Sequence, residues 1–249
     1  VVAFLAVQAL KNNPAYARKA LPDEKTMAEH YEAWLGYFKQ YCSERACWGL
    51  LWEIHSPTYG KWLVPDLLNL CDLAEDAELR ERVTNLMHLL WADWALDQIN
   101  LVTGGGKTRS YLNNYSEIGE IDSWRDMAKC LLAEDLAFLA NPKGFSKLAE
   151  DNSAIQFPFI FYTTSYKIPK IVFDLMLDRE KKGTYVYQSI RPGREGEIPE
   201  DFPRDVFQEP KAVRLMLAED SRCAKYSYAT PHFLLGSIWI DPNLKYGGG

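Results

Sequence analysis

The residues EIHSPTY, numbers 53–59, form a polar segment between two long apolar segments, and the rest of the chain is organised around them. The Ser-Pro pair at 56–57 predicts a helix start, because a serine hydroxyl caps free backbone N–H groups and proline at the first helical position gives up no hydrogen bond. Glu53 and His55 would point the same way from an extended chain, and Tyr59 falls in the first turn. The segment is therefore a candidate site. A structural loop explains the same residues, since a glutamate near a helix N-terminus also stabilises the helix dipole.

The composition fits a soluble, globular protein. The chain has 249 residues and a net charge of −6, without a stripe of Lys and Arg interleaved with aromatic residues, so we expect no nucleic-acid partner. The length suffices for one large domain or two ordinary ones with a substantial core. Residues 1–10 are apolar but too short to span a bilayer, and they lack the charged start of a signal peptide. We expect no membrane insertion, and we expect that residues before this segment are missing.

Metal and cofactor chemistry has no support in the sequence. The five cysteines are scattered, with no CxxC pair or zinc spacing, and the four histidines form no HExxH pair. His88 falls on an apolar helical pattern, which favours a structural histidine with a hydrogen-bond partner. We expect neither a metal ion nor a cofactor.

Apolar residues recur at spacings of three and four over much of the first 180 residues, which predicts helices with one face against a core. The pattern is clearest over residues 26–48 and after Asp76, which we expect to cap the next helix. Short connections between such helices make neighbours antiparallel hairpins. We also expect helices over residues 1–12, 14–20, 57–74 (kinked or split at Pro65), 121–140 and 168–181.

The end of the chain changes to a β pattern. Residues 184–189 predict a short strand, and YSYATPHFLLGSIWIDP, from Tyr226, mixes β-branched and aromatic residues. Residues 157–166 predict a strand or a buried irregular segment. The expected fold is mainly α, with a helical domain over residues 1–225 and the start of a β region or a tail over residues 226–249.

A polar loop of about twenty residues follows Ile99, and loops of this length usually carry function or are disordered. Its GGGKT does not complete a phosphate loop, because that motif needs glycine where the chain has Leu101. We interpret the glycines as a flexible hinge. The residues that follow suit the binding of carboxylates and hydroxyls, with an exposed, solvated loop as the alternative; they include Lys107, Arg109, Tyr111, Asn113, Asn114 and Tyr115.

Three features together resemble the heparinase II/III-like polysaccharide lyases: the serial helical hairpins, the E-x-x-S-P-x-Y pattern of residues 53–59, and YATPHFLLGS at residues 228–237. The resemblance covers residues 26–240 in general layout. It implies an incomplete (α/α) toroid of antiparallel hairpins followed by β-sandwich material, an acidic polysaccharide or oligosaccharide as substrate, and a periplasmic or secreted location.

The implied reaction is β-elimination at a uronate sugar, which needs a group that neutralises the carboxylate, a base for the neighbouring proton and an acid for the leaving oxygen. Tyr59 or Tyr111 would serve as base and acid, with His55 as an alternative base, and Glu53 would orient His55 or Arg109. The expected substrate-binding residues are Arg109, Asn114, Lys107, Trp52 and His232.

Two other functions remain open from the sequence. The first is an (α/α) toroid glycoside hydrolase, using Glu53 and a second carboxylate such as Asp122 as acid and base. The second is a non-catalytic glycan-binding module, in which aromatic side chains only dock the polymer.

Overall fold

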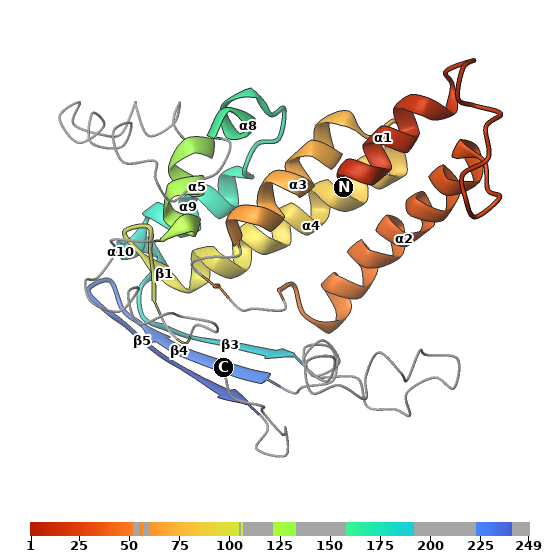
Figure 1. The fold of residues 1–249 in the computed structure, drawn as a ribbon. Helices are drawn as coiled ribbons and strands as arrows, with labels where there is room; N and C mark the ends of the chain where they lie inside the picture. The colour runs from red at the N-terminus through yellow and green to blue at the C-terminus, as the bar shows by residue number, and fades with distance from the viewer. Residues whose placement is uncertain are drawn as a thin grey trace.

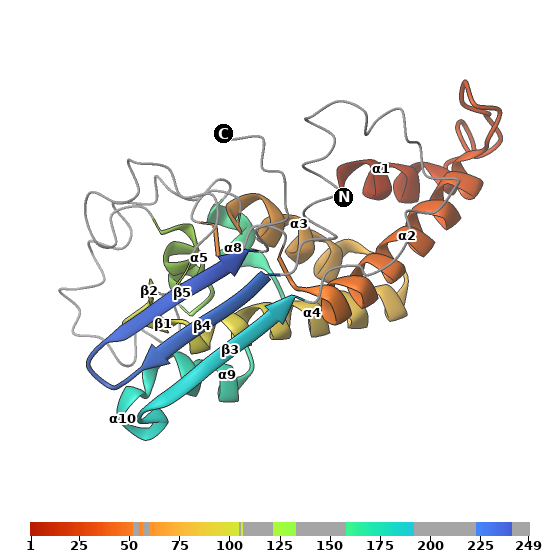
Figure 2. The same ribbon diagram turned by 90° about the horizontal axis from the view of Figure 1, so that it is seen from below.

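The computed structural model describes residues 1–51, 55–56, 60–104, 106, 122–132, 158–191 and 223–240. This part of the protein is mainly helical, with a small antiparallel sheet. The three-stranded sheet lies beneath the half of the helical part that holds α5 (Ser123–Leu131), α9 (Lys170–Leu177) and one end of α4 (Ala77–Leu96) (Figures 1 and 2). The helices α1 (Val2–Lys11) and α2 (Met27–Trp48) extend beyond the sheet. The fold therefore has a seam, at which the inner face of the sheet meets the helices.

The first four helices build most of the helical layer, and their starts follow from the sequence. Thr26 caps α2 in a capping box: its side-chain oxygen accepts from the Glu29 backbone N–H at 3.3 Å, and Glu29 accepts from the Thr26 backbone N–H at 2.8 Å. Asp76 caps α4 by accepting from the Leu79 N–H at 2.7 Å. These predicted starts are confirmed. The helices are α1 (Val2–Lys11), α2 (Met27–Trp48), α3 (Gly60–Leu73) and α4 (Ala77–Leu96).

Several other predictions need correction. Residues 14–18 form turns instead of a helix, because this exposed segment buries too little to offset the cost of helix nucleation. The expected strand or irregular segment at 157–166 contains a short helix, in which Phe161 is buried. The helix predicted over 168–181 is split at Asp178, which caps the second piece. The later helices are α5 (Ser123–Leu131), α8 (Pro158–Thr163), α9 (Lys170–Leu177) and α10 (Arg179–Lys182).

The main sheet joins β3 (Tyr185–Arg191), β4 (Cys223–Ala229) and β5 (Leu234–Ile240) in that order, all antiparallel. Along β4, alternate residues are buried against the helices while Tyr226 and Tyr228 are exposed, as expected for a sheet covered on one face. The expected domain boundary at 225/226 falls inside β4. The sheet therefore draws on residues from both sides of that boundary.

A short hairpin, β1 (Gln98–Ile99) with β2 (Val102–Thr103), follows α4. The next residues pack closely against β5: a Cβ atom on Gly104 would lie 2.5 Å from Leu234 Cδ2, and one on Gly106 would lie 2.6 Å from Ile238 Cβ. At these two positions the expected flexible hinge is instead a close contact. At Gly106 the contact is with backbone atoms of β5 and leaves no room for a side chain, whereas at Gly104 the end of the Leu234 side chain could move aside.

Three tryptophans form the centre of the core. Trp91 packs edge-on against Trp94 of the same helix at 5.7 Å between ring centroids, and against Trp124 of α5 at 5.6 Å. All three side chains are fully buried. This cluster supports the inner end of the segment that carries His55.

Candidate functional site

A group of charged and hydroxyl side chains lies between the helical layer and the sheet. It joins residues as far as 170 positions apart in the sequence. We call this group the seam cluster, and its members are His55, Asp93, Asp97, Tyr187, Lys225 and Ser227.

The backbone explains why these residues meet. Asp93 lies in the last turn of α4 and Asp97 follows its end, so the two are four residues apart and share one face of the helix. Lys225 and Ser227 are two apart on β4 and point to the same face of the sheet. Ser227 is paired in register with Tyr187 of β3.

Asp97 is the centre of the cluster. The ammonium group of Lys225 forms an ion pair with Asp97 Oδ2, and the Ser227 hydroxyl donates to Asp97 Oδ1. His55 Nδ1 lies 3.3 Å from Asp97 Oδ2 and 2.7 Å from Lys225 Nζ. Two N–H donors cannot face each other at 2.7 Å, so His55 Nδ1 accepts from Lys225 whenever the imidazole is neutral.

Asp93 connects the cluster to solvent. Its Oδ2 lies 2.8 Å from His55 Nε2; the distance is that of an ion pair, but the angle is outside the range of a hydrogen bond. Its Oδ1 accepts a hydrogen bond from the Tyr187 hydroxyl. The Asp93 side chain is 17% exposed and Tyr187 is partly exposed, whereas His55 and Asp97 are fully buried. Solvent therefore reaches the cluster at Asp93 and Tyr187.

The segment that carries His55 is held firmly on its other side. The Trp124 indole N–H donates to the Ser56 carbonyl at 3.2 Å, and the His55 ring lies edge-on to Trp124 at 5.8 Å between centroids. The backbone of His55 has φ = +44°, a left-handed conformation that histidine adopts more readily than most residues. Such strain, roughly 1–3 kcal/mol, persists where the surroundings fix the residue, and it concentrates at functional sites.

The cluster changes the acidity of its members. Burial and the Lys225 charge lower the pKa of His55, but the contacts with Asp93 and Asp97 outweigh them and raise it overall. Burial raises the pKa of Asp93, but the opposing effects of His55 and Lys225 are larger. The pKa is therefore lowered overall, and the carboxylate is the stable form. Burial, followed by the Asp93 charge, raises the pKa of Tyr187, so its phenol stays protonated at neutral pH.

Two of the candidate residues from the sequence can be placed. His55 lies at the heart of the seam cluster. His232 is exposed in the turn between β4 and β5, where its N–H donates to Thr230 Oγ1 at 3.1 Å. Lys225 and Thr230 are five residues apart along the strand direction, roughly 17 Å, so the fold does not bring His232 and His55 together.

The other candidate residues lie outside the described part of the chain, and two described residues adjoin them in sequence. Gly60, which follows Tyr59 directly, packs against Trp124: a Cβ atom there would lie 2.7 Å from Trp124 Cε2. Gly106, which precedes Lys107, packs against Ile238. The residues concerned are Trp52, Glu53, Tyr59, Lys107, Arg109, Tyr111 and Asn114.

Two further residues named from the sequence have structural roles. Asp122 caps α5 by accepting from the N–H groups of Trp124 and Arg125, and its second oxygen accepts from the Thr103 N–H at 2.8 Å. His88 Nδ1 forms a 3.0 Å hydrogen bond with the Tyr166 hydroxyl, as expected for a structural histidine.

Most of the seam cluster is not recognisable in the sequence alone: Asp93, Asp97, Tyr187, Lys225 and Ser227. A faint signal exists in the two aspartates, which are four apart on an otherwise apolar helix face. Nothing comparable marks Lys225, which reads as one exposed position of an alternating strand.

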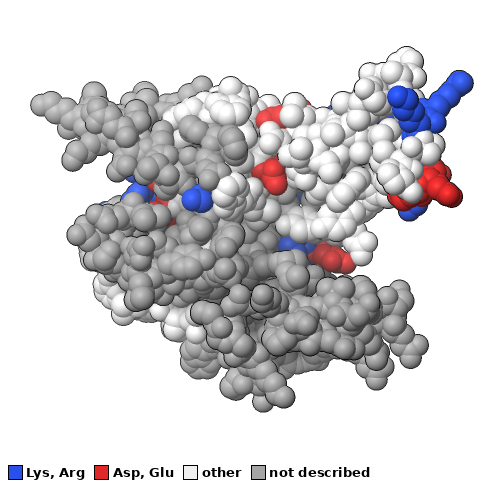
Figure 3. Space-filling view, in the orientation of Figure 1, with Lys and Arg blue, Asp and Glu red and all other residues white. Residues whose placement is uncertain are grey.

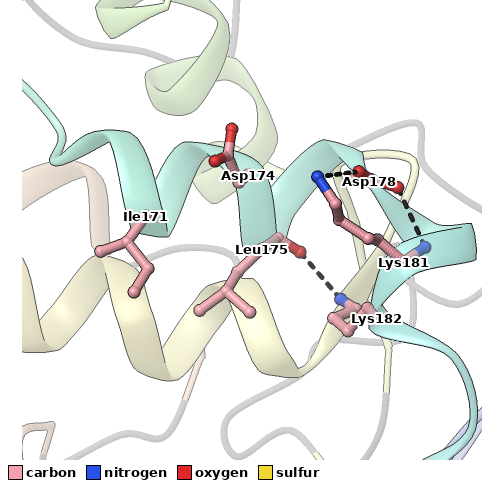
Figure 4. Close-up of a pocket in the computed structure, with 6 residues that line it drawn as sticks. All are labelled: Ile171, Asp174, Leu175, Asp178, Lys181 and Lys182. Carbon is pink, nitrogen blue, oxygen red and sulfur yellow. Dashed lines mark hydrogen bonds and ion pairs between the residues drawn. The ribbon is translucent and has the colours of Figure 1, made fainter.

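A second, weaker candidate is a surface hollow of about 150 Å³ beside α9 and α10 (Figure 4). Its Lys182 points at backbone instead of into the hollow: Nζ donates to the Leu175 carbonyl at 2.9 Å and the Ala95 carbonyl at 3.1 Å. Burial, with a smaller effect of Arg179, lowers the pKa of Lys182 to about 8. Lys181 pairs with Asp178 at 3.6 Å. Asp174, the other carboxylate of the lining, pairs with Lys170 at 2.7 Å, so each of these four polar side chains already has a partner within the protein.

Comparisons with known proteins assign the chain to no family. No family model, no curated protein and no solved structure matches the chain. Within the described ranges, none of the helices is both long and apolar enough to cross a membrane. On the face shown in Figure 3, charges of both signs gather at the end where α1 leads into α2.

Proposed function

We propose that this protein is a polysaccharide lyase that cleaves a uronate-containing polysaccharide by β-elimination, in the periplasm or outside the cell. In this proposal the helical hairpins form an incomplete (α/α) toroid, and the site lies at the seam between toroid and sheet. The resemblance of the EIHSPTY segment and of residues 228–237 to the heparinase II/III-like lyases motivates the reaction.

One observation carries the proposal: both polar segments singled out in the sequence are anchored beside Lys225. His55, from the first segment, lies 2.7 Å from Lys225 Nζ. Gly106, at the start of the second, packs against Ile238, which is the register partner of Lys225 in the sheet. Neighbouring strands lie about 5 Å apart, so His55 and Gly106 lie beside the same pair of strand residues, Lys225 and Ile238.

The chemistry divides between these two segments. Arg109, Asn114 and Lys107 neutralise the uronate carboxylate, which lowers the cost of removing the adjacent proton. Tyr59 and Tyr111 are the candidates for base and acid, while Trp52 stacks on a sugar ring and Glu53 orients a neighbour. His55 is buried and in contact with charged partners at both ring nitrogens, so we assign it a positioning role.

The hydrolase has less support. Asp122, its second carboxylate, is almost fully buried, and both of its oxygens already accept backbone hydrogen bonds. A carboxylate held in this way is a helix cap, and it has no free oxygen for a glycosidic bond.

The test is to incubate the protein with a panel of acidic polysaccharides and follow the near-ultraviolet absorbance of an unsaturated uronate product. We expect a rise that Tyr59→Phe abolishes, and that Tyr16→Phe, at an exposed tyrosine of the α1–α2 connection, leaves unchanged. New reducing ends without absorbance would indicate a hydrolase. Binding without turnover would indicate a glycan-binding module, and either result contradicts the proposal.

A further inference from the structure

The side of the seam cluster that reaches solvent presents a tyrosine. The Tyr187 hydroxyl donates to Asp93 Oδ1, the other oxygen of Asp93 contacts His55 Nε2, and His55 Nδ1 accepts from Lys225. Four ionisable side chains thus form one continuous chain of contacts. Its inner end is closed, and its outer end is a partly exposed phenol.

We propose that Tyr187 is a further catalytic residue, the general base that removes the proton next to the uronate carboxylate while its own proton passes to Asp93. This inference rests on the proposed lyase function and adds a residue to it. With Tyr187 as base, Tyr59 or Tyr111 is left to act as the acid.

The direction of the hydrogen bond favours this role. Because the hydroxyl hydrogen of Tyr187 points to Asp93, the oxygen lone pairs face away from Asp93; one meets the Ser189 side chain and the other can accept a proton. Burial and the neighbouring carboxylate raise the pKa of Tyr187, so a free phenolate is not available as base. Passing the phenol proton to Asp93 as the new proton arrives avoids forming that phenolate.

The atoms and charges balance. The carbon–hydrogen bond at the uronate C5 breaks, and its electron pair forms the C4–C5 double bond as the C4–oxygen bond breaks. The proton from C5 joins the Tyr187 oxygen, the earlier phenol proton moves to Asp93, and the leaving oxygen takes a proton from the acid.

The cluster can hold the extra proton. With His55 neutral, the carboxylates of Asp93 and Asp97 outnumber the single ammonium of Lys225, so the group carries one excess negative charge in a buried place. One added proton removes that excess charge for the duration of the step. Because burial raises the pKa of Asp93 less than His55 and Lys225 lower it, the proton then leaves to solvent at the exposed edge of that carboxyl group.

The experiment compares three variants with the wild type on whichever polysaccharide gives the elimination product. Tyr187→Phe removes the accepting oxygen, and Asp93→Asn keeps a side chain of the same shape that cannot take the proton. Tyr185→Phe is the matched control, since Tyr185 lies two residues away on the same face of β3 and donates only to the Leu96 carbonyl, at 2.8 Å. Urea unfolding of each variant shows whether it is folded at the assay temperature.

We expect kcat to fall about 100-fold or more in Tyr187→Phe and in Asp93→Asn, with KM nearly unchanged, and to stay within about twofold in Tyr185→Phe. As a second readout, the NMR titration of His55 should shift in Tyr187→Phe and not in Tyr185→Phe, because only Tyr187 contacts Asp93.

The failures are distinguishable. A folded Tyr187→Phe that cleaves at the wild-type rate overturns the role of Tyr187 and leaves the lyase function standing. An unmoved His55 titration overturns the coupling through Asp93, whatever the activity. A wild-type protein that yields no unsaturated product from any substrate overturns the lyase function itself, and the role of Tyr187 with it.

Discussion

Lys225 is a buried charge whose removal should be costly. Lys225→Met keeps much of the side-chain volume but leaves Asp97 without its ammonium partner, in a site closed to water. Breaking a buried pair from one side costs about 3–5 kcal/mol. We expect a loss of that size in the free energy of unfolding, measured by urea denaturation.

The matched control is Lys181→Met, because that lysine is 83% exposed and its partner is a surface aspartate. We expect little change there. A loss no larger in Lys225→Met than in Lys181→Met would show that Asp97 is neutral or solvated in the folded protein, against the arrangement described.

Replacing Gly106 by alanine should lower the stability of the protein, and replacing Gly36 by alanine should raise it. A Cβ atom on Gly106 would lie 2.7 Å from the backbone nitrogen of Ile238, so β5 or the loop must move, at a cost of about 1–3 kcal/mol. Gly36 lies inside α2 with nothing within 4 Å of its Cβ position, so alanine there should stabilise by about 0.5–1 kcal/mol.

Thermal unfolding of Gly106→Ala and Gly36→Ala measures both changes in stability. If Gly106→Ala unfolds at the wild-type temperature, the contact between the loop and β5 is looser than the structure indicates. Gly106 would then not be fixed beside Lys225, and only His55 would remain in contact with that lysine.

Among the helices, α5 depends on a single side chain. Asp122 accepts from the N–H groups of Trp124 and Arg125 and also from Thr103, which ties α5 to the β1–β2 hairpin. Asp122→Ala removes a cap worth about 0.5–2 kcal/mol and leaves the buried Thr103 N–H unpaired, at about 1–3 kcal/mol more. Urea unfolding should show a loss in the free energy of unfolding that is at least as large as one of these two contributions and no larger than their sum.

A second readout is the environment of His55. Because Trp124 on α5 binds the Ser56 carbonyl, loosening α5 should also shift the His55 ring signals in NMR spectra. Asp178→Ala, which removes the cap of the short, exposed α10, should leave those signals in place. Equal effects of the two variants would contradict a specific link between α5 and His55.

The helices that the sequence predicts well are those with both a cap and a buried face. The Thr26 and Asp76 caps and the apolar spacing that follows them act locally, so α2 and α4 can be recognised without the fold. The prediction for residues 158–163 is wrong because local propensity does not decide their structure. Their aromatic composition favours a strand, and the fold overrides that propensity in so short a segment.

For the protein as a whole, the free energy of unfolding should fall both at acid pH and at alkaline pH. The folded pKa of His55 is raised, so its contribution is complete below the ordinary value of about 6.5 and is lost as the pH rises through the folded pKa. The folded pKa of Asp93 is lowered, so its contribution is present above the ordinary value of 3.8 and is lost as the pH falls through the folded pKa. The free energy of unfolding should therefore be highest between these limits.

Urea unfolding between about pH 3 and pH 9 tests this. In His55→Gln the decline on the alkaline side should disappear, while the decline on the acid side remains from the other carboxylates. A wild-type curve that keeps rising from pH 6 to pH 9 would show that His55 is neutral throughout, and that its carboxylate contacts do not favour its protonation.

The sequence located one member of the seam cluster and could not assemble the rest. His55 stood out because a turn-forming Ser-Pro pair follows it. Lys225 could not be identified, since an alternating strand does not reveal which face is covered until the helices are in place. Local patterns fix helices, whereas a buried charge is defined by partners that are distant in sequence.

The seam cluster also sets an order of events for a growing chain. His55 and Asp97 are 42 residues apart, but Lys225 follows His55 by 170 residues, so the two carboxylates of α4 emerge long before the ammonium that neutralises them. Until β4 is made, those charges must stay hydrated, and the seam cannot close. Contacts over so long a stretch of chain form slowly. The helices therefore reach their final packing only after Lys225 has been synthesised and the sheet has formed.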